Sequence, residues 1–202
     1  MKKQVIVIHG GDSYETREKF LDALKNWEVT KESFVPKSDW KSILQKDLGE
    51  EYEILAPRMP NKQNAKYDEW KIWFEKMLPF VQDGVIFVGH SMGGLFLAKY
   101  LSENSFPKKI NAFFLVAPPY RNTDDIDNFP IIGDLQRVWE QCPNIHIFQS
   151  EDDPLVSMNE AEEYKKAWPE AKMHIFQDRG HFNQENFPEI VEELKKENSG
   201  EE

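Results

Sequence analysis

Short apolar runs alternate with longer amphipathic segments along most of this chain. The runs are rich in β-branched and aromatic residues, as strands are, and the intervening segments repeat apolar side chains at helical spacing. The strand candidates are residues 5–8, 53–55, 85–88, 112–116, 145–148 and 173–176, and the helix candidates are residues 15–27, 67–78, 93–104, 159–168 and 186–196. Alternation of this kind predicts an α/β fold, a three-layer α/β/α sandwich around a mostly parallel six-stranded sheet. Phe20, Leu21 and Leu24 share one side of the first helix candidate, so we expect that helix to cover the sheet.

Two segments interrupt the alternation. Residues from about 28 to 50 predict an extra helix and loop between the first two strands, and residues from about 118 to 143 follow the fourth strand. Neither segment is long enough for a separate lid domain. We therefore expect one domain over residues 1–196, followed by a flexible C-terminal tail at residues 197–202. The sequence leaves open whether the 28–50 insertion shapes or covers a pocket.

Charge and cysteine content exclude several classes of protein. The formal net charge of -11 argues against nucleic acid or an anionic membrane as a partner, because phosphate binding depends on Lys and Arg. No apolar stretch reaches the roughly 18 residues that a membrane helix needs. Cys142 is the single cysteine, and the first residues enter a strand pattern without a signal-peptide core. We expect a cytoplasmic protein, and its oligomeric state is left open.

One serine stands between glycines where the third apolar run ends. The stretch Gly89-His90-Ser91-Met92-Gly93 fits the pattern G-x-S-x-G, with a strand candidate before it and a helical pattern after it. Residues two before and two after the serine of such a turn approach each other closely, so glycine is required there on steric grounds. The alternative is a glycine-rich turn that binds phosphate or merely packs tightly. The chain contains neither the P-loop pattern nor the dinucleotide-binding glycine pattern, so Ser91 is predicted to be a nucleophile.

A serine nucleophile needs a base, and in an α/β fold with this turn the acid and then the histidine follow the serine in the chain. That order removes His9 and His90, and His146 and His174 lie inside strand patterns, where they are expected to be structural. His181 instead follows the last strand directly after Gly180, which permits a tight turn. His181 is therefore the predicted base.

Two adjacent aspartates follow the fifth strand. Asp153 is preferred as the acid because Pro154 favours an extended conformation before it, and because Leu155 and Val156 are expected to bury the loop. Asp152 remains the alternative acid, although a turn or capping role suits it better. Three further aspartates lie farther along the polar segment after the fourth strand and are expected to be exposed: Asp124, Asp125 and Asp127.

Backbone amides near Ser91 are the candidates for stabilising an oxyanion. The N–H of Met92 begins the helix after the serine, and the N–H of Gly11, at the end of the first strand, is the preferred second donor, with Gly10 and Asp12 as alternatives. His9 is expected to brace that loop by hydrogen bonding. Four large side chains are weaker candidates for substrate contacts: Tyr14, Met59, Tyr120 and Trp139.

The motifs Gly-His-Ser-Met-Gly-Gly (89–94), Asp-Asp-Pro-Leu-Val (152–156) and Arg-Gly-His-Phe (179–182) follow one another in the order seen in a known superfamily. The chain resembles the α/β-hydrolases, and more narrowly the small serine hydrolases related to retinoblastoma-binding protein 9. The resemblance implies a minimal α/β-hydrolase fold without a full lid, with Ser91 as nucleophile, Asp153 as acid and His181 as base. It also implies acyl transfer through an ester intermediate, with no metal and no organic cofactor. The 28–50 segment is longer than the corresponding loop of that family, and no Leu-x-Cys-x-Glu motif is present.

The leading hypothesis from the sequence is a carboxylesterase-type serine hydrolase that acts on small carboxylic esters. Amides, peptides and thioesters would use the same residues. The alternative is a catalytically silent protein-binding module on the same scaffold. Cys142 is rejected as a nucleophile because Pro143 follows it and no helix that could lower its pKa begins there.

Overall fold

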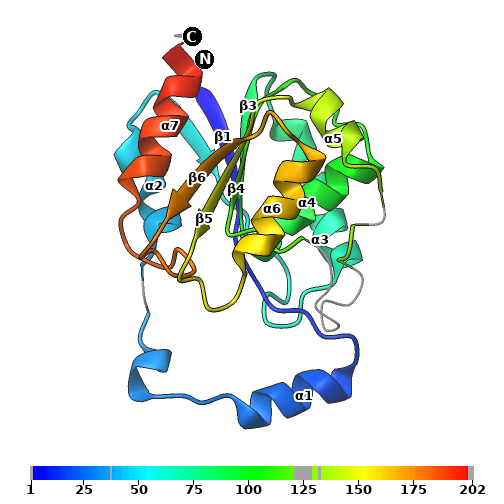
Figure 1. Cartoon of the computed structure of the whole chain (residues 1–202), viewed down its shortest axis with the longest axis vertical. Coiled ribbons are helices and arrows are strands. Elements are labelled where there is room, and N and C mark those ends of the chain that lie inside the picture. The colour runs from blue at the N-terminus through cyan, green and yellow to red at the C-terminus, as the bar shows by residue number, and fades with distance from the viewer. Residues whose placement is uncertain (1, 37, 121–128, 132, 200–202) are drawn as a thin grey trace.

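A parallel sheet of six strands forms the centre of the computed structural model, which describes residues 2–36, 38–120, 129–131 and 133–199. The strand order is β2-β1-β3-β4-β5-β6, and every neighbouring pair is parallel. In chain order the elements are β1 (Lys3–Ile8), α1 (Arg17–Asn26), a 3-10 helix (Lys31–Phe34), α2 (Trp40–Leu48), β2 (Tyr52–Leu55), α3 (Tyr67–Glu75), a 3-10 helix (Leu78–Phe80), β3 (Val85–His90), α4 (Met92–Glu103), β4 (Ile110–Val116), α5 (Gln136–Gln141), β5 (Ile145–Ser150), α6 (Met158–Ala167), β6 (Lys172–Phe176) and α7 (Pro188–Ser199). The predicted three-layer α/β/α sandwich is confirmed (Figure 1).

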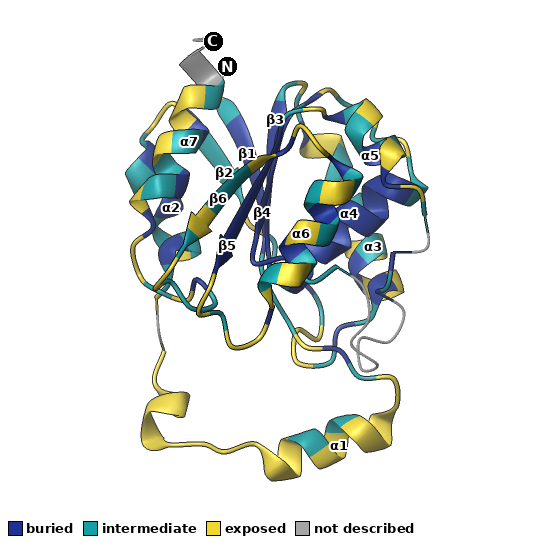
Figure 2. Ribbon diagram, viewed as in Figure 1, coloured by how far each residue is buried: buried dark blue, intermediate teal, exposed yellow. Residues whose placement is uncertain are grey.

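Helices cover both faces of the sheet, and each face has its own core. On one face α3, α4, α5 and α6 pack over a core that includes Ile6, Phe87 and Leu115. On the other face α2 and α7 pack over a core that includes Val7 and Phe114. All six residues of the central strand β3 are buried (Figure 2). Since parallel strands place their carboxyl ends at one edge, the loops after β1, β3, β5 and β6 meet there.

Helix α1 departs from the prediction. It contains no buried residue, and Leu21 and Leu24 are exposed, so the expectation that it covers the sheet is wrong. The segment around it instead extends beyond the carboxyl edge of the sheet (Figure 1). The covering role belongs to α2 in the 28–50 insertion, because Trp40, Leu44 and Leu48 lie at spacing i, i+4, i+8 and form one buried stripe.

The C-terminal helix is longer than expected. The sequence predicts an end near residue 196, but α7 continues to Ser199, and Glu197 hydrogen bonds to the side chains of Asn144 and His146 at the start of β5. The start of the predicted tail at residue 197 is therefore helical, and residues 200–202 lie outside the described part. In the described ranges, no helix combines the length and the apolar character that crossing a membrane requires.

Candidate active site

Ser91 occupies a strained turn between β3 and α4. Its backbone has φ 53° and ψ -126°, in the left-handed region that non-glycine residues rarely adopt. The Ser91 N–H donates to the carbonyl of Val116 at 2.8 Å, and the N–H of Gly94 donates to the Ser91 carbonyl at 2.8 Å. The turn thus has the predicted strand–turn–helix form, and the two hydrogen bonds hold the serine at the carboxyl edge.

The two glycines that flank Ser91 are required by contact with backbone atoms. A Cβ on Gly89 would lie 2.5 Å from the Cα of Gly94, and a Cβ on Gly93 would lie 2.2 Å from the carbonyl oxygen of Ile8. Neither contact can be relieved by moving a flexible side chain. The steric need for glycine at both positions is therefore confirmed. The expected close approach across the turn accounts for Gly89, whereas Gly93 is restricted by the backbone of β1.

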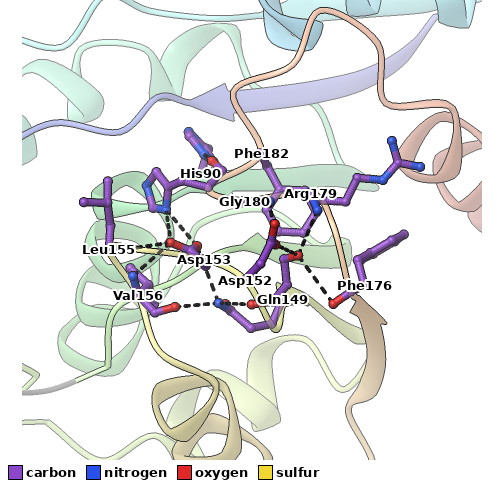
Figure 3. A network of polar contacts seen from close by, with 12 residues as sticks. His90, Gln149, Asp152, Asp153, Leu155, Val156, Phe176, Arg179, Gly180 and Phe182 are labelled. Carbon is purple, nitrogen blue, oxygen red and sulfur yellow. Dashed lines mark hydrogen bonds and ion pairs between the residues drawn. The ribbon is translucent and has the colours of Figure 1, made fainter.

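His181 and Asp153 form an ion-pair geometry beyond β5 and β6. The Nδ1 atom of His181 lies 2.9 Å from Oδ2 of Asp153 and 3.2 Å from Oδ1. The Asp153 side chain is fully buried, and its Oδ1 also accepts from the N–H groups of Leu155 and Val156 at 2.8 and 3.0 Å (Figure 3). Burial alone raises the pKa of this carboxyl, but the hydrogen bonds from His181 and the two amides outweigh it and hold the pKa below its usual value.

Asp152, the alternative acid, holds the loop of His181 rather than its ring. Its Oδ1 accepts from the Ser150 hydroxyl at 2.6 Å and from the Gly180 N–H at 2.8 Å (Figure 3). The Ser150 hydroxyl oxygen in turn accepts from the N–H of Arg179 at 3.0 Å. Asp152 therefore takes the turn-forming role expected of it, and Asp153 is the carboxylate that contacts the His181 ring. Asp124, Asp125 and Asp127 lie outside the described residues.

Ser91 and His181 line the same cavity, whose volume is about 420 Å³. That volume lies within the range of small-molecule sites. Within the described residues, no hydrogen bond joins the Ser91 hydroxyl to the His181 ring. Contacts of this type are commonly long in a free enzyme and shorten when substrate binds.

The loop after β1 packs directly against the nucleophile. A Cβ on Gly10 would lie 3.0 Å from the Cβ of Ser91, and a Cβ on Gly11 would lie 2.5 Å from the Lys62 carbonyl oxygen. The N–H of Asp12 already donates to that Lys62 carbonyl at 2.8 Å, which removes Asp12 from the candidate oxyanion donors. The N–H of Met92 starts α4 and has no intrahelical acceptor.

His9 braces this loop as expected. Its Nε2 accepts from the N–H of Met59 at 2.9 Å, so Nδ1 carries the proton and donates to the Gly10 carbonyl at 2.6 Å. Burial lowers the pKa of His9, in keeping with a neutral ring. His9 thereby fixes the glycines that approach Ser91.

The insertion supplies contacts to the His181 loop that sequence reasoning missed. The indole N–H of Trp40 donates to the Phe182 carbonyl at 2.9 Å, and the backbone N–H of Trp40 donates to the Gln184 carbonyl at 3.1 Å. The residue after the histidine, Phe182, has a positive φ of 52°, so this part of the loop is strained. No local pattern in the sequence indicates these contacts. The available signal was a large apolar residue, Trp40, in the insertion, which suggested that this segment packs against the rest of the fold.

His90 links the same insertion to the nucleophile. Its Nε2 faces the His181 carbonyl at 2.9 Å, so this nitrogen carries the proton and Nδ1 is free to accept from the Lys41 ammonium at 3.4 Å. Lys41 is itself paired with Asp39 at 2.7 Å. Burial, followed by the charge of Lys41, lowers the pKa of His90 well below its usual value, so the ring is neutral.

The expected substrate-contact residues lie elsewhere. Tyr14, Met59, Tyr120 and Trp139 are all described, and none of them lines the cavity. Met59 is buried in the core, and Tyr120 and Trp139 pack against that core. Leu155 and Val156 were expected to bury the loop of Asp153; Val156 is buried, but Leu155 is 68% exposed and lines the cavity with Trp27. The charged groups on the cavity wall are Asp12, Asp39, Lys41 and Lys62.

Three of the residues rejected as nucleophile or base, Cys142, His146 and His174, do not line the cavity. Cys142 is buried, and burial raises the pKa of its thiol to about 12. His146 and His174 lie inside β5 and β6, as predicted, with their rings stacked on Phe114 and Phe148.

Similarity to known proteins bears on the family and on the fold of this chain. A family model described as "Serine hydrolase" matches residues 35–195. Serine hydrolase RBBP9 of Rattus norvegicus is 29% identical over 150 residues, which span 71% of this chain and 77% of the rat protein. Among solved structures, the ydeN gene product of B. subtilis has a TM-score of 0.77 at 19% identity, covering 98% of this chain and 100% of its own. A lipase-esterase related protein from Clostridium acetobutylicum has a TM-score of 0.59 at 13% identity, with 96% and 93% covered. At these identities the two structures support the fold alone.

Proposed function

The chain belongs to the serine hydrolase family, and from that premise we propose that it hydrolyses small carboxylic esters by acyl transfer through Ser91, His181 and Asp153. The observation that carries the proposal is the 2.9 Å contact between His181 and the buried Asp153, made at the wall of the cavity that Ser91 also lines. A carboxylate in this position orients the imidazole and stabilises its protonated form.

Each step of the proposed cycle uses one of these groups. The Ser91 oxygen attacks the ester carbonyl carbon while Nε2 of His181 takes the hydroxyl proton, and the buried Asp153 stays ionised against the imidazolium. The tetrahedral intermediate collapses, His181 returns the proton to the leaving alkoxide, and the acyl group remains on Ser91. Water then attacks the acyl-enzyme, with His181 again as base, and the acid is released.

Backbone amides are proposed to hold the developing oxyanion. The N–H of Met92 is the first amide of α4, whose dipole favours negative charge at that end. The N–H of Gly11 is the second donor, since Gly11 lines the cavity and the loop around it packs against Ser91. One such donor contributes roughly 3 kcal/mol to transition-state stability in a well-studied protease.

The cavity favours short, polar substrates. It is small, and two acidic and two basic side chains share its wall with Trp27 and Leu155. A long alkyl chain would displace water from charged groups without replacing their interactions, which is unfavourable. We therefore expect acetyl and butyryl esters to be better substrates than dodecanoyl esters.

The experiment is a series of p-nitrophenyl esters assayed with the native chain and with Ser91→Ala. The proposal predicts ester hydrolysis by the native chain, at least about tenfold greater kcat/KM for acetyl than for dodecanoyl ester, and background rates for Ser91→Ala. Ser105→Ala is the matched control, because Ser105 is an exposed serine outside the cavity. Equal rates for the native chain and Ser91→Ala would contradict the proposal and favour the catalytically silent binding module.

A further inference from the structure

Two histidines and a carboxylate meet between α7 and the sheet, away from the cavity. His146 is on β5, His174 is on the edge strand β6, and Glu193 is on α7. The Nδ1 atom of His146 lies 3.1 Å from Nε2 of His174 and 3.8 Å from Oε2 of Glu193, and all three ligand atoms lie within 4.8 Å of one another. Small side-chain movements would let these atoms share one cation, since zinc ligands at about 2.0–2.2 Å from the ion lie at most about 4.4 Å apart.

A second carboxylate fixes the tautomer that a metal requires. Oε1 of Glu197 lies 2.9 Å from Nε2 of His146, so that nitrogen carries the proton and Nδ1 presents its lone pair toward His174 and Glu193. Metal-bound histidines usually donate their other N–H to a carboxylate in this way. Burial lowers the pKa values of both His146 and His174, so neither ring is protonated at neutral pH.

The lysines around the cluster pair with carboxylate oxygens in a way that leaves Oε2 of Glu193 available to bind a metal ion. Lys196 pairs with Oε1 of Glu193 at 2.6 Å, which leaves Oε2 directed toward His146. Lys172 pairs with Glu197 at 3.2 Å, on the far side of the His146 ring. The nearby cations are thus each matched by a carboxylate.

We propose that His146, His174 and Glu193 form a Zn²⁺ site that is independent of the hydrolytic site. Two imidazole nitrogens and one carboxylate oxygen suit Zn²⁺ and disfavour Mg²⁺ and Ca²⁺, which take oxygen ligands. Zinc replaces the proton that Nε2 of His174 shares with Nδ1 of His146, and the His174 proton moves to its own Nδ1. Because His174 and Glu193 are only partly buried, water completes the tetrahedral coordination.

The proposed site would tie the C-terminal helix to two strands. One ion would connect β5, β6 and α7 on the face opposite α4. His146 is near the amino end of β5, about 13 Å along the strand from Ser150, where the loop to Asp153 begins. Zinc here would therefore change stability and leave the chemistry at Ser91 unchanged.

The experiment measures Zn²⁺ binding to the full chain after treatment with a chelator. We expect one zinc per chain by calorimetry, and a rise in Tm of about 5–10 °C when free zinc is a hundredfold above its Kd. His174→Gln should abolish binding at this site, and Glu197→Gln should weaken it about 10–100-fold. Circular dichroism on each variant without zinc shows whether it folds.

A matched control separates this site from the histidines of the cavity. His181→Gln removes another partly buried histidine but leaves the cluster intact, so it should keep the zinc stoichiometry and the rise in Tm. No zinc binding by the native chain, or unchanged binding by folded His174→Gln, would overturn the proposal. Loss of zinc in His181→Gln alone would place the metal in the cavity, and would overturn it equally.

Discussion

The indole N–H of Trp40 donates a hydrogen bond to the carbonyl of Phe182, the residue directly after His181, at 2.9 Å. Trp40 begins α2, so the insertion between the first two strands is attached to the loop that carries the predicted base. The Trp40 ring also meets His90 edge to face, with 6.1 Å between ring centroids. The insertion thus contacts the His181 loop and His90 through Trp40, and it also lines the cavity through Asp39 and Lys41.

Replacing Trp40 by Phe should lower kcat clearly while lowering the free energy of unfolding only slightly. The substitution keeps a buried ring but removes the hydrogen bond to Phe182, which costs about 1 kcal/mol in the free energy of unfolding. Because the His181 loop loses one support, we expect kcat to fall about three- to tenfold with little change in KM. Steady-state kinetics and urea unfolding measure the two effects.

Trp168→Phe is the matched control for Trp40→Phe. Trp168 is fully buried, and its indole likewise donates to a backbone carbonyl, that of Leu135, at 2.9 Å. The Trp168→Phe variant should lose a similar amount of free energy of unfolding but keep the kcat of the native chain. Equal losses of kcat in both variants would show that Trp40 acts only through general stability.

Asp153→Asn and Asp152→Asn should have very different effects on ester hydrolysis. Asp153 holds the His181 ring, so we expect its replacement to reduce kcat/KM by about 10³–10⁴-fold, as loss of the triad carboxylate does in a serine protease. Asp152 holds only the Gly180 amide and the Ser150 hydroxyl, so its replacement should cost about tenfold or less. If Asp152→Asn were the more damaging change, the assignment of the acid would be reversed.

Gly93→Ala should destabilise the fold strongly. The new Cβ would lie 2.2 Å from the Ile8 carbonyl oxygen in the central sheet, so β1 or α4 must move. We expect a loss of about 3 kcal/mol or more, measured by thermal or urea unfolding. Gly84→Ala is the comparison, since its site has no neighbour within 4 Å and only a positive φ of 83°, which costs about 1 kcal/mol.

Stability should fall as the pH is lowered from 7 to 5. Burial lowers the pKa values of His90 and His146, so the unfolded chain takes up protons near the ordinary value of 6.5 before the folded chain does. The free energy of unfolding therefore rises with pH between the folded-state pKa and about 6.5. The stability that the two neutral rings contribute is complete above about pH 6.5 and is lost as the pH falls through that window. We expect a loss on the order of 2 kcal/mol, measured by urea unfolding at each pH without added metal. A flat profile would mean that the folded and unfolded chains take up protons over the same pH range, which would contradict the lowered histidine pKa values.

The sequence predicted those parts of the molecule that local chemistry determines. The glycines around Ser91, the turn at Gly180 and the loop of Asp153 each follow from steric or backbone requirements within a few residues. The contact between Trp40 and Phe182 spans 142 residues, so no local pattern could predict it. Helix α1 shows the same limit, because periodicity indicated an apolar side but could not show that α2 covers the sheet in its place.

The pocket was the least predictable part for a related reason. Four large side chains were candidates for substrate contacts, but most of them belong to the core or pack against it. Besides the loops that carry Ser91 and His181, the cavity wall comes from charged residues and from Trp27. Lys41 and Asp39 reach the cavity only because α2 packs against the His181 loop. Such side chains can be identified only when the elements are placed in three dimensions.

Labelling with a fluorophosphonate probe, mapped by mass spectrometry of peptides, tests the central claim most directly. The probe reacts only with a serine that a base activates. We predict one label on the native chain, at Ser91, with labelling at least about a hundredfold slower in folded His181→Gln. Labelling at another serine, or no difference in rate between the native chain and His181→Gln, would contradict the account.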